Sequence, residues 1–183
     1  MLEGALRGGI RVVQYRAKAG VDVGIVRRMR DRCAGIGGLL IVNDDADAAL
    51  VADGLHAGQE DLERLGRGLR SKIGPRVLGI SCGTPDEAVA AAALDADYIG
   101  VGPFAPTGNK SDAGPAIGVA GIRAAVAASP LPVVAIGGIG LENLAEVKAS
   151  GARMAAVISA LVRDGDPERS ARSLVQAWGP HRG

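Results

Sequence analysis

An alternation along the chain constrains the fold more than any other feature of the sequence. Short apolar runs rich in Val and Ile are separated by longer stretches of helical period that are rich in Ala, Leu and Arg. This pattern is typical of βαβ units, in which helices connect parallel strands and cover the sheet. The expected strands are Ile10–Tyr15, Leu39–Val42, Gly54–His56, Val77–Ile80, Tyr98–Val101, Val133–Ile136 and Ala155–Ile158. The expected helices are Asp22–Cys33, Asp45–Val51, Glu60–Ile73, Pro85–Leu94, Val119–Ala128, Leu141–Ser150 and Pro167–Trp178.

The number of strands predicts an α/β fold of the (β/α)₈ TIM-barrel type that lacks the first strand. The chain opens on Leu2–Arg7, which has the pattern of a helix, and its 183 residues fall below the roughly 200 of complete barrels. A barrel without one strand would have two unpaired edges. Three explanations compete: an open seven-stranded sheet, a gap filled by a partner or by rearrangement, and a start that misses upstream sequence. We favour the third.

Composition narrows the class of protein. No linker or low-complexity tract divides the chain, so residues 1–183 are expected to form one domain. The formal net charge of +1 favours neither nucleic acid nor an anionic membrane as a partner. Cys33 and Cys82 lie far apart without metal-ligand spacing, and no apolar run approaches the roughly 20 residues of a membrane span. We therefore expect a cytoplasmic protein that binds small molecules, and the sequence is also compatible with a homo-oligomer.

Polar and glycine residues gather where the expected strands end. Because the carboxyl ends of parallel strands meet at one edge of the sheet, these residues should line one concave face. They are Gln14, Arg16 and Lys18, then Asn43 and Asp44, His56, Gln59 and Asp61, Ser81, the Gly102–Asp112 loop, Gly137 and Gly138, and Ser159.

Each of these groups has a structural alternative to a functional role. Gln14, Arg16 and Lys18 alternate, so they either present cations to a diphosphate or form a solvated strand end. Asp44 and Asp61 either cap helices or share a Mg²⁺ ion, which takes one or two carboxylates together with waters and phosphate oxygens. The Gly137-Gly138 turn suits a backbone approach to a phosphate, although diglycine turns are common.

Two further assignments follow from position. His56 stands among apolar neighbours, so we expect a structural histidine rather than a ligand. Thr107, Asn109 and Lys110 offer donors to anionic oxygens, or they simply belong to a polar loop.

In their order along the chain, these motifs resemble those of thiamine-phosphate synthases over nearly the whole length. The matching stretches are Val13–Lys18, Ile41–Asp45, Asp53–Asp61, Ala96–Pro103, Pro106-Thr107, Ala135–Ile139 and Val157–Ala160. The resemblance implies that 4-amino-2-methyl-5-(diphosphomethyl)pyrimidine loses pyrophosphate and that the nitrogen of a thiazole phosphate captures the pyrimidine carbon. It also implies that the carbon–oxygen bond breaks largely before the new bond forms, so that no protein nucleophile is needed.

The resemblance also implies residue roles. Gln14, Arg16, Lys18 and Asn43 would hold the diphosphate, and Asp44 and Asp61 would bind Mg²⁺. Thr107 and Asn109 would hold the thiazole phosphate with backbone groups of Gly138, Ile158 and Ser159. Ser81 would contact the pyrimidine and Lys110 would neutralise the leaving pyrophosphate, so Lys110, Arg16 and Ser81 are the expected catalytic residues.

The chain also departs from the family pattern. The segment between Asn43 and Asp53 is shorter than usual by about two residues, which puts the meeting of Asp44 and Asp61 in question. Asn109 replaces a usual threonine, Ala17 a common glutamate and Gly83 a common histidine. Two other functions therefore stay open: a thiazole tautomerase-like paralogue, and a noncatalytic barrel that binds phosphate ligands.

The Lys110→Ala variant should lose turnover by at least about a hundredfold, because it removes a preorganised charge from the departing pyrophosphate. Steady-state formation of thiamine phosphate from both substrates measures this loss. A near-normal rate would contradict the role of Lys110.

Overall fold

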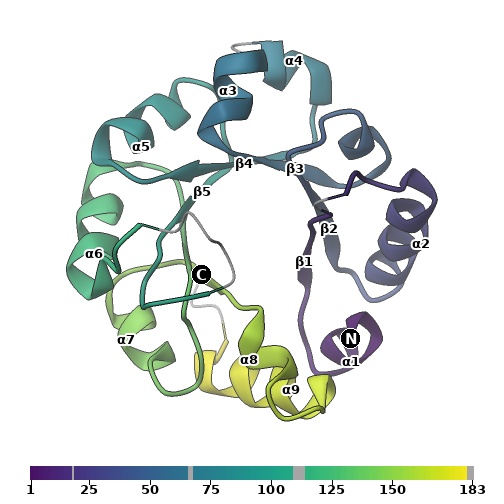
Figure 1. Cartoon of the computed structure of the whole chain (residues 1–183), viewed down its shortest axis with the longest axis vertical. Helices are drawn as coiled ribbons and strands as arrows, with labels where there is room; N and C mark the ends of the chain where they lie inside the picture. The colour runs from purple at the N-terminus through teal and green to yellow at the C-terminus, as the bar shows by residue number, and fades with distance from the viewer. Residues whose placement is uncertain (18, 66–67, 109–113, 181–183) are drawn as a thin grey trace.

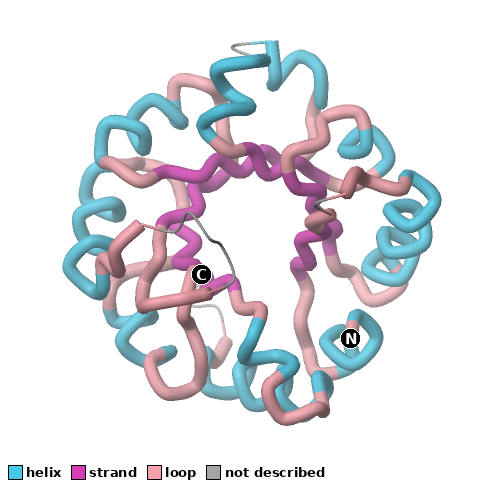
Figure 2. Tube along the Cα trace, in the orientation of Figure 1, coloured by secondary structure: helices cyan, strands magenta, loops and turns pink. Residues whose placement is uncertain are grey.

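Seven parallel strands curl into most of a barrel. The computed structural model describes residues 1–17, 19–65, 68–108 and 114–180. Its sheet follows the order of the sequence from β1 to β7, and each strand is parallel to its neighbours. Figure 1 and Figure 2 show the ring of strands inside a layer of helices. The strands are β1 (Val12–Tyr15), β2 (Leu39–Asn43), β3 (Gly54–Ala57), β4 (Val77–Cys82), β5 (Tyr98–Val101), β6 (Val133–Ile136) and β7 (Met154–Ala156).

Helices form the outer layer. They are α1 (Leu2–Arg7), α2 (Val23–Ala34), the 3₁₀ helix η1 (Ala48–Val51), α3 (Gln59–Leu65), α4 (Gly68–Ile73), α5 (Pro85–Ala92), α6 (Gly118–Ala128), α7 (Leu144–Ala149), α8 (Ser159–Val162) and α9 (Pro167–Trp178). Asp22, Thr84 and Asp166 accept hydrogen bonds from the free N–H groups at the starts of α2, α5 and α9. Within the described part of the chain, no helix is long and apolar enough to cross a membrane.

The predicted elements are confirmed with two local differences. The helix expected at Glu60–Ile73 is described as α3 and α4, and residues 66–67 between them lie outside the described residues. The helix expected at Asp45–Val51 is only a 3₁₀ turn, because Asp45 binds the N–H groups of Asp47 and Ala48 and so delays the helical start. The last strand ends at Ala156, and Ser159 begins the unpredicted helix α8.

Alternation along the strands sorts side chains between the barrel interior and the helical layer. On β2, Leu40 and Val42 are fully buried against Val26 and Cys33 of α2. Asn43 at the end of β2 is paired with His56 of β3. Residues two positions apart on a strand point to the same face of the sheet as each other. A carboxylate holds the amino end of β4. Asp97 accepts a hydrogen bond from the N–H of Leu78 at 2.7 Å and another from the guanidinium group of Arg70 at 2.8 Å.

The sheet does not close on itself in the described residues: β1 and β7 are its two edges. The helical layer closes instead, because α1 packs against α9 beside this opening (Figure 1). Arg7 on α1 bonds Glu168 on α9 at 2.7 Å. Val12 on the edge strand β1 is 45% exposed, as expected where no further strand lies beside it. The expected barrel lacking one strand is therefore the observed fold.

Replacing Gly8 with alanine should destabilise the protein by about 1–3 kcal/mol, as overpacking usually does. A Cβ at Gly8 would lie 2.5 Å from Cβ of Ala171 and 2.5 Å from the backbone oxygen of Glu168, which would push α1 away from α9. Equilibrium urea unfolding measures the free energy. The matched control is Gly68→Ala, where no atom lies within 4 Å, and it should be neutral or slightly stabilising. Equal stability of the Gly8 variant and the wild type would show that the α1–α9 contact is not tight.

Candidate active site

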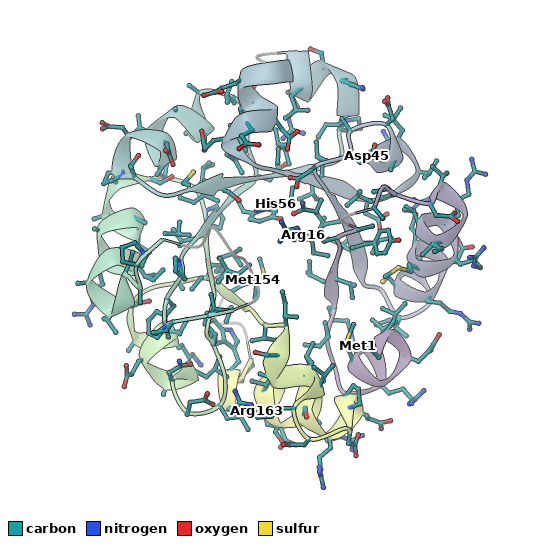
Figure 3. All side chains as sticks on the ribbon, viewed as in Figure 1. Met1, Arg16, Asp45, His56, Met154 and Arg163 are labelled. Carbon is teal, nitrogen blue, oxygen red and sulfur yellow. The ribbon has the colours of Figure 1, made fainter. Side chains whose placement is uncertain are left out.

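The carboxyl ends of the strands meet at one rim of the ring, and the predicted polar residues lie along it. Strand β1 ends at Tyr15, β2 at Asn43, β3 at Ala57 and β4 at Cys82. Each of these strands pairs in parallel with the next one, so the four ends lie at the same rim. Viewed along the barrel, Arg16 and His56 point toward the interior, whereas Asp45 lies outside the ring (Figure 3). The parallel sheet thus brings together residues that are far apart in the sequence.

Asp44 and Asp61 are neighbours at this rim. A Cβ placed on Gly58 would lie 3.9 Å from Oδ1 of Asp44 and 3.9 Å from Oδ2 of Asp61, so both carboxylates flank the same glycine. The two side chains also hydrogen-bond to each other. Asp44 has a φ of 61°, an uncommon value for a residue other than glycine, and its N–H bonds the carbonyl of His56 at 2.9 Å. The shortened segment before Asp53 therefore does not keep the two carboxylates apart.

The groups around Asp44 shift the pKa of its carboxyl in opposing directions. Desolvation raises the pKa of Asp44, and the hydrogen bond and negative charge of Asp61 raise it further. The cation of Arg16 and the N–H of Gly58 act in the opposite direction. The side-chain amide of Asn43 donates to the Asp44 carboxylate. A cation bound between the two carboxylates would offset the repulsion from Asp61 that helps to raise the pKa of Asp44.

These residues fit a Mg²⁺ ion. Mg²⁺ usually takes one or two carboxylates and completes its shell with water and substrate phosphate oxygens. Among the described residues, no group of three or more His, Cys, Asp or Glu side chains could hold a metal by itself. An ion here would therefore depend on the Asp44–Asp61 pair and on ligands from a bound diphosphate.

A second set of polar residues lies in the interior below the rim. The ring of His56 is 9% exposed and bonds the hydroxyl of Tyr98 at 2.9 Å and Oγ of Ser81 at 2.9 Å. Gln14 on β1 hydrogen-bonds to Tyr98. The side-chain amide of Gln59 donates to the backbone carbonyl of Ser81. Ser81 and Gln14 were predicted site residues, whereas the linking role of Tyr98 was not anticipated.

The turn after β6 lies against the loop after β5. Gly137 and Gly138 have φ values of 91° and 65°, which a side chain would disfavour. A Cβ on Gly138 would meet the backbone oxygen of Ala105 at 2.6 Å and that of Pro106 at 2.8 Å. Asn143 holds the turn, since its amide donates to the carbonyl of Gly138 at 2.9 Å. The two loops therefore support each other at the rim.

The remaining predicted residues divide by position. Thr107 is half-buried directly after the segment that touches Gly138, and Ile158 and Ser159 are exposed where α8 begins. These residues follow β5 and β7, whereas Gln14, Arg16 and Asn43 lie on or directly after β1 and β2. Lys18, Asn109 and Lys110 lie outside the described residues.

Sequence reasoning could have identified Tyr98 from its register. The strand pattern places Tyr98 two residues before Gly100, and the neighbouring strand carries Gly79 two residues before Ser81. Glycines inside strands often mark close approach by another group. That signal becomes specific only when the register of β3, β4 and β5 is known.

Comparison with known proteins gives a consistent result. Residues 1–161 match the family model described as "Thiamine monophosphate synthase". The chain is 42% identical over 182 residues to thiamine-phosphate synthase of Desulfitobacterium hafniense, an alignment that covers 95% of this chain and 86% of the relative. It is 45% identical over 180 residues to thiamine-phosphate synthase of Moorella thermoacetica, with 95% and 85% covered.

A solved structure extends the likeness to three dimensions. Thiamine phosphate pyrophosphorylase from Pyrococcus furiosus superposes with a TM-score of 0.86 at 33% sequence identity. The match covers 97% of this chain and 87% of that protein.

Lowering the pH should destabilise the protein through His56. Burial lowers the pKa of His56 to about 4, whereas the unfolded chain has a histidine pKa near 6.5. Between these values the unfolded chain binds a proton that the folded chain does not, so the free energy of unfolding falls as the pH falls. The expected loss from pH 7 to pH 5 is about 2 kcal/mol. Urea unfolding across this range should show it in the wild type and not in His56→Gln. Parallel pH profiles of the two proteins would contradict the assignment.

Proposed function

Since the chain belongs to the thiamine monophosphate synthase family, we propose that Asp44 and Asp61 hold a Mg²⁺ ion where the diphosphate of the pyrimidine substrate binds. The enzyme joins 4-amino-2-methyl-5-(diphosphomethyl)pyrimidine to a thiazole phosphate and forms thiamine phosphate and pyrophosphate. The single observation that carries the proposal is the contact between the two carboxylates beside Arg16 and Asn43.

The reaction requires charge stabilisation rather than a protein nucleophile. The bond between the pyrimidine methylene carbon and the diphosphate oxygen breaks, and its electron pair leaves with pyrophosphate. The lone pair of the thiazole nitrogen then forms the new bond to the methylene carbon. The protein must therefore stabilise the growing negative charge and hold the acceptor close to the carbon.

The diphosphate end of the site would use the residues on β1 and β2. Arg16 points into the interior and carries a positive charge close enough to act on Asp44 (Figure 3). Gln14 and Asn43 add amide donors from neighbouring strands that pair in register. In this proposal Lys18 and Lys110 add further cations to the diphosphate and to the departing pyrophosphate. A bound Mg²⁺ would supply charge neutralisation at the leaving oxygens.

The organic parts of the substrates would occupy the rest of the rim. Ser81 lies at the end of β4, held by Gln59 and His56, and would contact the pyrimidine. Thr107 and Asn109 would bind the thiazole phosphate with backbone groups of Gly138, Ile158 and Ser159. The positive φ of Gly137 and Gly138 supports this role, because consecutive N–H groups in such turns can converge on an anion.

Replacing Asp44 with alanine should reduce turnover at least about a hundredfold, because the metal and the charge it neutralises are lost from the leaving group. Formation of thiamine phosphate should be measured over a Mg²⁺ titration, and the variant should need far more Mg²⁺ for half-maximal rate. Chelation of Mg²⁺ should abolish turnover in the wild type.

The control for this variant is Asp47→Ala. Asp47 is a carboxylate that follows Asp44 closely in the sequence, but its side chain is 82% exposed and bonds Lys72 at 2.9 Å. This substitution should leave turnover and the Mg²⁺ dependence unchanged. If Asp44→Ala behaves like Asp47→Ala, the proposed metal site is wrong. If well-folded wild-type protein with both substrates and Mg²⁺ forms no thiamine phosphate, the proposed site chemistry fails as a whole.

A further inference from the structure

His56 and Tyr98 meet across a strand that carries no side chain between them. His56 on β3, Gly79 on β4 and Tyr98 on β5 are paired in one row of the sheet. A Cβ on Gly79 would overlap the ring of Tyr98, and one on Gly100 would lie 2.9 Å from Cε1 of His56. The two rings have centroids 5.5 Å apart. Two strand glycines thus provide the space in which this pair lies.

Both members of the pair are buried and neutral. Burial lowers the pKa of His56 to about 4 and raises the pKa of Tyr98 above its ordinary value. A neutral imidazole has one donor nitrogen and one acceptor nitrogen. Since one ring nitrogen faces Tyr98 and the other faces Ser81, His56 must accept from one of them and donate to the other.

One possible direction of these hydrogen bonds runs from Gln14 on β1 to Ser81 on β4. When the amide N–H of Gln14 donates to the phenol oxygen of Tyr98, the Tyr98 hydroxyl donates to Nδ1 of His56, and Nε2–H of His56 donates to Oγ of Ser81. Because Ser81 accepts this bond, its own hydrogen is left to donate to a further group.

We propose that His56 and Tyr98 are positioning residues that connect Gln14 on β1 to Ser81 on β4 and fix the Ser81 hydroxyl as a donor toward the pyrimidine substrate. This inference rests on the proposed function, since it takes Ser81 and Gln14 to contact that substrate. Ser81 is held on two sides, by His56 at its hydroxyl and by Gln59 at its carbonyl. A purely structural role would not require a buried polar pair that joins two residues facing the site.

A double-mutant cycle tests the proposal. The Tyr98→Phe variant removes one oxygen and keeps the ring, and it should lower kcat/KM about tenfold. Ser81→Ala should lower kcat/KM about a hundredfold. The double variant should be no slower than Ser81→Ala, because Tyr98 acts only through Ser81 on this path. His56→Gln, which keeps a donor for Ser81, should retain more activity than His56→Leu.

The matched control is Tyr15→Phe. Tyr15 packs on the opposite face of β1 against the helical layer, so its loss of one oxygen should leave kcat/KM unchanged. If Tyr98→Phe keeps wild-type kcat/KM while Ser81→Ala does not, the inference is wrong and the proposed function stands. If the double variant loses kcat/KM by the product of the two single fold-losses, Tyr98 acts independently of Ser81. Its role is then structural, and the inference is again wrong. If Ser81→Ala is fully active, the role of Ser81 in the proposed function is wrong and this inference falls with it.

Discussion

The common direction of the seven strands is the constraint on which the rest of this structure depends. Each strand follows its neighbour in the sequence and runs parallel to it, so every strand presents its carboxyl end at the same rim. Residues from Arg16 to Ser159 are thereby placed around one interior. The chain has almost no net charge, so any recognition of phosphate depends on local cations. Partial desolvation strengthens the interactions of such charges.

Space inside the ring is controlled by small residues. Gly79 and Gly100 leave room for the rings of His56 and Tyr98, and Gly137 and Gly138 let the turn after β6 approach the loop after β5. The polar groups this space admits are paired, as buried polar groups generally must be. His56 uses both ring nitrogens, and Asn143 fixes the diglycine turn. A site built this way is held by contacts from neighbouring strands and loops rather than by any single element.

Helices α1 and α9 pack against each other outside the opening between β1 and β7. Arg7 at the end of α1 and the following Gly8 bring this helix onto α9, so the two ends of the helical layer touch where the two ends of the sheet do not. The residues proposed for the diphosphate stand on β1 and β2, next to this opening. The residues proposed for the thiazole phosphate stand on the loops after β5, β6 and β7. The α1–α9 contact therefore joins the outer layer across the opening that separates β1 from β7.

The sequence alone determined the type and order of the elements. Apolar period and caps predicted all seven strands and helices such as Pro167–Trp178, because these signals act over neighbouring residues. It also identified Asp44, Asp61 and Ser81 as residues of one rim. Only the tertiary structure decided that Asp44 and Asp61 touch despite a shortened segment, and that Tyr98 reaches His56 across Gly79. Such contacts depend on strand register and on the path of the chain between strands, which are set by packing over the whole sheet rather than by any local stretch of residues.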